Sequence, residues 1–200
     1  MISFEKKFIF IHIPKTAGTS IEKTIEDKSC IFKRNQWSDK PLGFNAPLNH
    51  LTINQVEVSK KIKRTDIETF FKFTFVRNPW DRVISECFCS HIQLIFKDCK
   101  SINDKIRVVC SLAEKGYGGH CKKQVHFTTS SNYTMDYVGR YENLVNDFNC
   151  ICKQLGIEQK DLPQTNKSKR VSYKDYFNQE MIDLVARTYS DDINNFNYDF

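Results

Sequence analysis

Two largely apolar stretches, Phe8–Ile13 and Phe70–Val76, are the clearest pattern along this chain. Apolar runs of this length are typical of strands that are buried on both faces of a parallel sheet. A shorter stretch, Tyr137–Tyr141, lies further along the chain and predicts a third core strand. We also expect a short strand at Cys30–Lys33.

Between these stretches, apolar residues recur at the three- and four-residue spacing of helices. The spacing predicts helices at Thr19–Asp27, Leu51–Lys63, Asn78–Ile95, Asn103–Lys115, Leu144–Leu155, Tyr173–Phe177 and Gln179–Tyr189. Loop-forming residues predict irregular connections at 35–49 and 116–134. Strands that alternate with helices favour a parallel sheet covered on both faces. Because no repeat or linker divides the pattern, we expect a single domain over residues 1–200.

The first apolar stretch leads into the segment Pro14–Ser20, which reads Pro-Lys-Thr-Ala-Gly-Thr-Ser. Helix-compatible residues follow at once, as in a strand, a tight loop and a helix N-terminus. Such a loop presents several backbone N–H groups and one ammonium to a single anion, so a phosphate or sulfate is the natural occupant. The Walker A pattern of nucleoside triphosphate-binding proteins is absent, because here the lysine precedes the glycine.

The second apolar stretch is followed by Arg77 and by a helix start, predicted from Asn78 and Pro79. Arg77 would lie at the carboxyl end of a strand, where ligands bind in open α/β sheets. Its planar guanidinium can bind a phosphate through two hydrogen bonds. Ser85 shares a helix face with Asp81 and can donate to the same phosphate. Alone, this segment is better explained by a surface Arg–Asp pair, but with the first loop it predicts a ligand with two phosphate-like groups.

The net charge of +6 favours anionic partners, among which are a phosphorylated cofactor, an acidic polysaccharide and nucleic acid. The eight cysteines include no C-x-x-C pair. Cys87, Cys89 and His91 alternate within a predicted helix, where residues two apart point to different faces, so we expect no zinc site there. Mostly reduced, partly buried thiols are expected, with one or two disulfides as the alternative in an oxidising compartment.

Taken in order, the motifs resemble those of sulfotransferases that use 3′-phosphoadenosine 5′-phosphosulfate (PAPS), of the carbohydrate type related to heparan sulfate sulfotransferases. The segment His12–Ser20 is similar to the 5′-phosphosulfate loop of that family, and Arg77–Arg82 with Ser85 is similar to its 3′-phosphate motif. Gly139–Leu144 and the ending Tyr189–Phe200 also resemble family segments. The resemblance implies an α/β, three-layer, P-loop-NTPase-like sulfotransferase fold with a short central parallel sheet.

The resemblance also implies that PAPS donates the sulfuryl group and leaves as PAP, with no metal ion expected. Lys15 would be catalytic, because it is placed to neutralise the charge that develops on the leaving phosphate. The implied cofactor-binding residues are Lys15, Thr16, Ala17, Gly18, Thr19, Ser20, Arg77, Ser85, Lys169 and Arg170. Many family members have glycine where this chain has Ala17, and alanine suits that position unless it requires a positive φ. Gln124 resembles a family position that faces the active site.

The acceptor hydroxyl needs a base, and His50 is the candidate because the family places a catalytic histidine after the first strand–helix unit. The family's base can also be a glutamate. His126 and His120 are weaker candidates, and His12 lies inside a strand as a predicted core residue. The implied partner is a hydroxyl-bearing acceptor, most simply a carbohydrate, and not nucleic acid.

Two other functions fit parts of the pattern. A nucleotide-binding kinase of similar architecture is disfavoured by the missing Walker A pattern and by the lack of a magnesium-binding carboxylate pair. A non-catalytic protein that binds PAP or a polyanion is disfavoured by the presence of Lys15 and His50. No apolar stretch reaches the length of a membrane span. We expect a soluble, cytoplasmic protein, or one in the Golgi lumen if an N-terminal anchor has been removed.

Overall fold

A computed structural model describes residues 1–34, 36, 47–116, 119–159, 161–163 and 171–200. The chain forms two compact units. The first, here called the sheet unit, comprises Met1–Val76 and His126–Thr165. The second, here called the helical unit, comprises Arg77–Val125 and Asn166–Phe200. The single domain expected over residues 1–200 stays a prediction.

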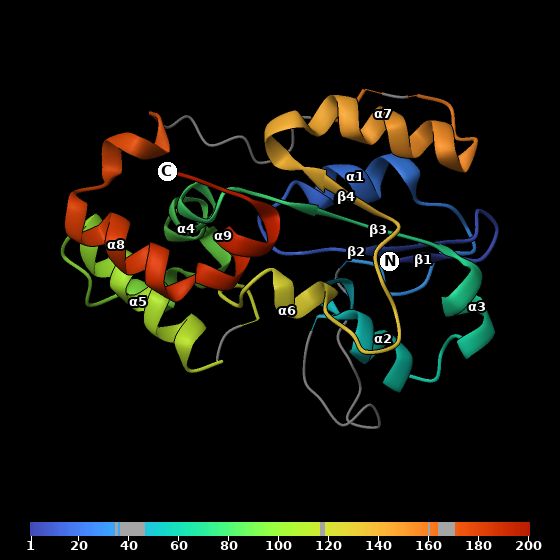
Figure 1. Cartoon of the computed structure of the whole chain (residues 1–200), viewed down its shortest axis with the longest axis horizontal. Coiled ribbons are helices and arrows are strands. Elements are labelled where there is room, and N and C mark those ends of the chain that lie inside the picture. The colour runs from blue at the N-terminus through green and yellow to red at the C-terminus, as the bar shows by residue number, and fades with distance from the viewer. Residues whose placement is uncertain (35, 37–46, 117–118, 160, 164–170) are drawn as a thin grey trace. The chain divides into compact units, whose positions relative to one another are not determined.

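The sheet unit contains a four-stranded sheet with the order β1-β2-β3-β4 (Figure 1). Its strands are β1 (Ile2–Ser3), β2 (Phe8–Ile11), β3 (Phe71–Val76) and β4 (Tyr137–Arg140). The last three are parallel, which confirms the three predicted strands, but β4 is a half-exposed edge strand and not a core strand. The antiparallel β1 is too short to leave a pattern in the sequence. The strand expected at Cys30–Lys33 is wrong, because only Ile31 forms a bridge there, to Ile2.

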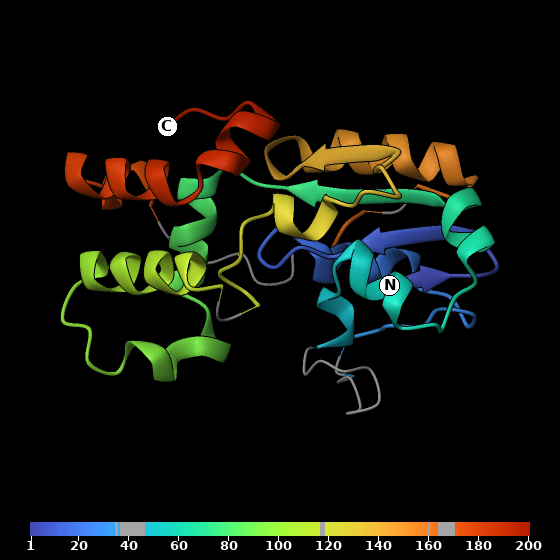
Figure 2. The ribbon, with the colours of Figure 1, turned by 60° about the horizontal axis from the view of Figure 1, so that its bottom comes forward.

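One face of this sheet is covered by α1 (Gly18–Ile25) and α7 (Leu144–Leu155). Alternate residues of a strand point to the same face, so Phe10 and Phe73 face these helices together. Their ring centroids lie 4.9 Å apart, and they share a buried cluster with Ile21 and Phe148. Figure 1 and Figure 2 both show α7 running along β4.

The opposite side of the sheet in Figure 1 carries the shorter helices of the sheet unit. These are η2 (Leu48–His50), α2 (Ile53–Val58), α3 (Arg64–Thr69) and α6 (Val125–Thr128). The single helix predicted over Leu51–Lys63 is wrong, because the chain turns at Lys60, which has a φ of 54°. A further short helix, η4 (Tyr141–Asn143), follows β4. Because helices cover both faces of the sheet, the unit has the three layers that the resemblance implied.

The helical unit consists of α4 (Pro79–Cys87), η3 (Ser90–Phe96), α5 (Ile102–Glu114), η5 (Tyr173–Tyr176), α8 (Gln179–Thr188) and α9 (Ser190–Phe196). The predicted start of α4 is confirmed, since Asn78 Oδ1 accepts hydrogen bonds from the N–H groups of Trp80 and Asp81. Its predicted continuation to Ile95 is wrong, because Phe88 leaves the helical conformation and a 3₁₀ segment follows. Trp80 and Val185 lie in the apolar core that joins these helices.

Among the described residues, no helix is long and apolar enough to cross a membrane. All eight cysteines are free thiols, and only Cys150 is exposed while Cys99 is half-buried. Burial raises the pKa of the Cys110 thiol to about 12, although a hydrogen bond to Thr188 opposes the rise. The expectation of largely buried cysteines is confirmed, and their redox state stays a prediction.

Candidate functional site

The loop after β2 has two residues in the left-handed region of the backbone map. Lys15 has a φ of 68° and Ala17 a φ of 67°. Ala17 is the residue before the first turn of α1, and its carbonyl accepts hydrogen bonds from the N–H groups of Ser20 and Ile21. Thr16 is fully buried, and its hydroxyl donates to the carbonyl of Ile13 over 2.8 Å. The loop therefore turns tightly into a helix N-terminus, where the helix dipole favours an anion.

Position 17 requires a positive φ, so it suits glycine better than the alanine that this chain has. A non-glycine residue in the left-handed region costs about 1 kcal/mol. We expect Ala17→Gly to raise the free energy of unfolding by about 0.5–1 kcal/mol, measured by denaturant titration. As a matched control, Ala186→Gly makes the same change inside α8 and should destabilise by about 1 kcal/mol. Equal destabilisation by both variants would contradict the backbone assignment.

Gly18 is required by the close approach of an imidazole. A Cβ atom placed at Gly18 would lie 2.0 Å from Cδ2 of His12. His12 is only 4% exposed, and its Nδ1 lies 2.9 Å from Oε1 of Glu22. Since Glu22 is on α1, this contact joins the end of β2 to the helix that follows it. His12 is thus a buried structural residue, as predicted.

Glu22 is a buried carboxyl group that contacts His12 and forms an ion pair with Arg34. Its side chain is 1% exposed, and burial raises the pKa of this carboxyl above its usual range. The guanidinium Nε of Arg34 lies 3.2 Å from Oε2. A group enclosed in this way can orient His12, but it cannot reach an acceptor. Glu22 is therefore unsuited to be a catalytic base of the glutamate kind that the resemblance allows.

His50 lies at the end of η2 and contacts the residue that follows β2. Its Nδ1 donates to the carbonyl of His12 over 2.9 Å, which leaves Nε2 with the lone pair. Asn49 Nδ2 donates to that Nε2 over 3.1 Å. The rings of His12 and His50 meet edge to face with centroids 4.4 Å apart. The base candidate is thus oriented by Asn49 and by the strand end, and the sequence pattern alone did not identify Asn49.

Arg77 and Ser85 lie in the helical unit. The Arg77 side chain is 7% exposed, and its Nη2 lies 2.7 Å from Oδ2 of Asp81. Gln124 makes two hydrogen bonds to the Arg77 backbone, donating to its carbonyl and accepting from its N–H. Ser85 is half-buried one helical turn beyond Asp81. This geometry holds the Arg77 backbone rigidly and pairs its guanidinium with an acid.

The other residues predicted for the site are distributed as follows. Lys15, Thr16, Gly18 and His50 all belong to the sheet unit, as do Ala17, Thr19 and Ser20. Lys169 and Arg170 lie outside the described residues. His126 is exposed on α6.

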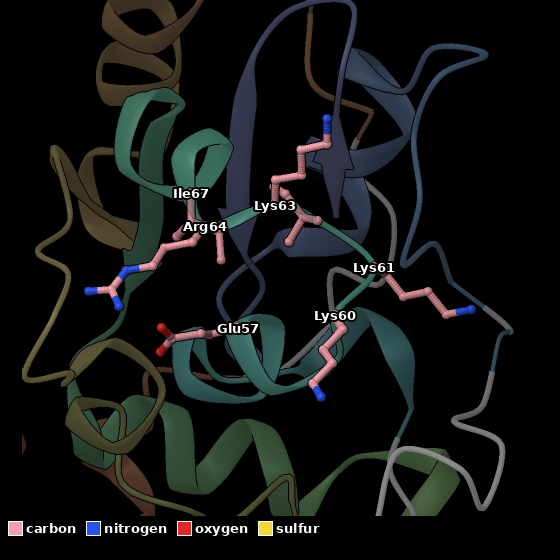
Figure 3. Close-up of a pocket in the computed structure, with 7 residues that line it drawn as sticks. Glu57, Lys60, Lys61, Lys63, Arg64 and Ile67 are labelled. Carbon is pink, nitrogen blue, oxygen red and sulfur yellow. The ribbon is translucent and has the colours of Figure 1, made fainter.

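A basic pocket of about 460 Å³ lies elsewhere in the sheet unit, between α2 and α3. Its lining residues are Glu57, Lys60, Lys61, Ile62, Lys63, Arg64 and Ile67. Figure 3 shows Lys60, Lys61 and Lys63 pointing in different directions. Arg64 pairs with Glu68 over 3.1 Å. Because its cations diverge, this pocket does not form a converging site for one anion.

A mostly parallel sheet flanked by helices, with a tight loop leading from its first long strand into a helix N-terminus, defines an α/β protein. The model of the Sulfotransferase family matches residues 1–199 of the chain. The chain belongs to this family, and its activity is therefore of the sulfuryl-transfer class. No curated protein and no solved structure matches it.

Proposed function

We propose that this sulfotransferase moves a sulfuryl group from PAPS to a hydroxyl of a carbohydrate acceptor. The observation that carries the proposal is the loop from Pro14 to Ser20 at the N-terminus of α1. Its two left-handed residues turn the backbone there, and it carries Lys15. A loop of this geometry fits the 5′-phosphosulfate end of the donor through backbone N–H groups and the helix dipole.

In the proposed reaction the acceptor oxygen attacks sulfur in line with the leaving phosphate oxygen. Lys15 stabilises the negative charge that grows on that leaving oxygen. The hydroxyls of Thr19 and Ser20 add donors at the first turn of α1. His50 accepts the proton of the acceptor hydroxyl at Nε2, since its Nδ1 already donates to the carbonyl of His12. For this step the acceptor hydroxyl must replace the Asn49 amide as the donor to Nε2.

The 3′-phosphate of the donor is assigned to Arg77 and Ser85 on the strength of the sequence motif. For Arg77 to bind it, the guanidinium must share its donors between the phosphate and Asp81. An arginine has five N–H donors, so both contacts are compatible. Lys169 and Arg170 are proposed to add positive charge near the cofactor, as the resemblance implies.

The proposal is tested first by ligand binding. Saturating PAP is expected to raise the melting temperature, because a ligand that binds only the folded state stabilises it by mass action. ATP with Mg²⁺ is the comparison that tests the kinase alternative. Radiolabelled PAPS and a panel of glycans then test transfer. Stabilisation by ATP with Mg²⁺ alone would favour the kinase, and PAP binding without transfer to any acceptor would favour the non-catalytic protein.

His50→Ala is expected to lower kcat by about 100-fold, because a positioned general base contributes at least that much. The affinity for PAP should stay unchanged, since the proposed role of His50 concerns the acceptor alone. Steady-state kinetics and a PAP titration of the same variant separate the two effects. His126→Ala is the matched comparison on α6 and should retain turnover. If His50→Ala keeps full turnover and His126→Ala loses it, the base is His126.

A further inference from the structure

Three side chains with metal-binding atoms converge in the helical unit, apart from the residues proposed for transfer. A carboxylate oxygen of Glu86, Sγ of Cys89 and a ring nitrogen of His120 all lie within 4.8 Å of one another. Glu86 is in the last turn of α4, and Cys89 follows two residues after that helix ends. His120 lies in the segment that leads to Gln124.

Glu86 is the residue of this cluster whose environment favours a bound cation. It is 1% exposed, and neither of its carboxylate oxygens has a hydrogen-bond partner among the described residues. Burying an ionised carboxylate without hydrogen bonds is costly, so such groups are normally paired or bound to a cation. Nδ1 of His120, which can carry a proton, lies 3.3 Å from Oε1.

A Glu86–His120 ion pair is the competing account of this cluster. Burial alone would lower the pKa of His120, but Cys89 and Glu86 next to it raise this pKa to about 9. The ion pair accounts for one carboxylate oxygen. It does not explain why Oε2 of Glu86 is also buried without a hydrogen bond.

The backbone around the cluster is held firmly by side chains of the helical unit. Arg82 is 2% exposed, and its Nη2 donates to the carbonyls of His120 and Lys122 over 2.7 and 2.8 Å. The hydroxyl of Tyr189 donates to the carbonyl of Cys121 over 2.8 Å. The ligand from this segment is thus fixed against α4 before any ion binds.

We propose that Glu86, Cys89 and His120 bind one Zn²⁺ ion, with water as the fourth ligand. A thiolate, an imidazole and a carboxylate are all zinc ligands, and this mixed set suits zinc better than the oxygen-preferring Mg²⁺ or Ca²⁺. Ligand atoms around tetrahedral zinc are on the order of 3.5 Å apart, so only small side-chain movements are needed. The ion takes no part in sulfuryl transfer. It ties the end of α4 to the segment carrying Gln124, which holds the Arg77 backbone.

The test is metal binding by the full-length chain. Metal-free protein under reducing conditions is titrated with Co²⁺, which gives visible absorption and a thiolate charge-transfer band when bound to Cys in a tetrahedral site. Zn²⁺ should then displace Co²⁺, and metal analysis should find one zinc per chain. We expect Zn²⁺ to raise the melting temperature of the metal-free wild type.

Cys89→Ser should abolish the thiolate band, and Glu86→Gln should weaken Zn²⁺ binding by at least tenfold. The matched control is Cys99→Ser, which removes a half-buried thiol of the same unit and should leave metal binding unchanged. Because the wild-type titration needs no variant, poor folding of a variant does not weaken the test. Absence of Co²⁺ and Zn²⁺ binding to the wild type would leave the Glu86–His120 ion pair as the explanation. A thiolate band that persists in Cys89→Ser would place the metal elsewhere.

Discussion

Lys15→Ala is expected to lower the rate of sulfuryl transfer by about 1000-fold. A preorganised donor aimed at charge that develops in the transition state is worth about 3–4 kcal/mol. Lys15 belongs to a loop whose backbone is held in an uncommon conformation, with a φ of 68° at Lys15 itself. Such a conformation sets the direction in which the side chain leaves the backbone, so a neighbouring lysine cannot replace it.

The measurement is single-turnover transfer from radiolabelled PAPS, with PAP affinity determined in parallel. The loss should fall mainly on the rate and not on PAP affinity, because the charge on the leaving oxygen develops during the reaction. Lys23→Ala removes an exposed lysine from α1 and serves as the matched control for net charge. Lys15→Ala with normal transfer, or a loss shared equally by Lys23→Ala, would refute the role given to Lys15.

Gly18→Ala is expected to destabilise the sheet unit by about 2–3 kcal/mol, since overpacking a buried contact costs this much. The added methyl would lie 2.0 Å from His12, whose ring is stacked on Phe10 and joined to Glu22. The ring cannot move away without breaking that contact with Glu22. For a chain of this size the melting temperature should fall by roughly 5–10 °C.

Gly119→Ala is the control for the glycine-to-alanine change, because a Cβ at Gly119 meets nothing within 4 Å. The double variant His12→Ala with Gly18→Ala separates the steric cause from others. It should recover part of the stability relative to the sum of the single variants, since the clash is gone. Simple additivity of the two losses would show that the close approach of His12 does not matter.

The strands β2 and β3 could be predicted because burial on both faces requires an apolar run, and such a run is visible in adjacent residues of the sequence. The helix breaks at Lys60 and Phe88 could not be predicted, because the apolar spacing continues through both positions. Where each helix ends depends on packing partners that are far away in the sequence. The two-residue β1 and the short helices α3, α6 and α9 were missed for a related reason. Elements this short are stabilised by tertiary contacts and carry little periodicity.

The candidate site was found from the sequence to the extent that its chemistry lies in contiguous residues. The loop around Lys15 and the segment after Arg77 each carry a recognisable order of residue types, and the match to the Sulfotransferase family is consistent with them. The role of Glu22 could not be predicted, because it contacts His12, which precedes α1 in the chain. Asn49 is next to His50 in the chain, but adjacency alone does not show that its side chain reaches the His50 ring. The pairing of Glu86 with His120 likewise joins residues 34 positions apart.

The sequence by itself determined the class of this protein: the parallel strands, the tight loop after the first of them and the family. These depend on burial patterns and on residues that are adjacent in the chain. Only the tertiary structure decided that Ala17 has a left-handed backbone, that Gly18 leaves room for His12, and which nitrogen of His50 has the lone pair. The physical reason is that backbone conformation, close packing and hydrogen-bond direction depend on where distant segments meet, and residue order alone does not specify those meetings.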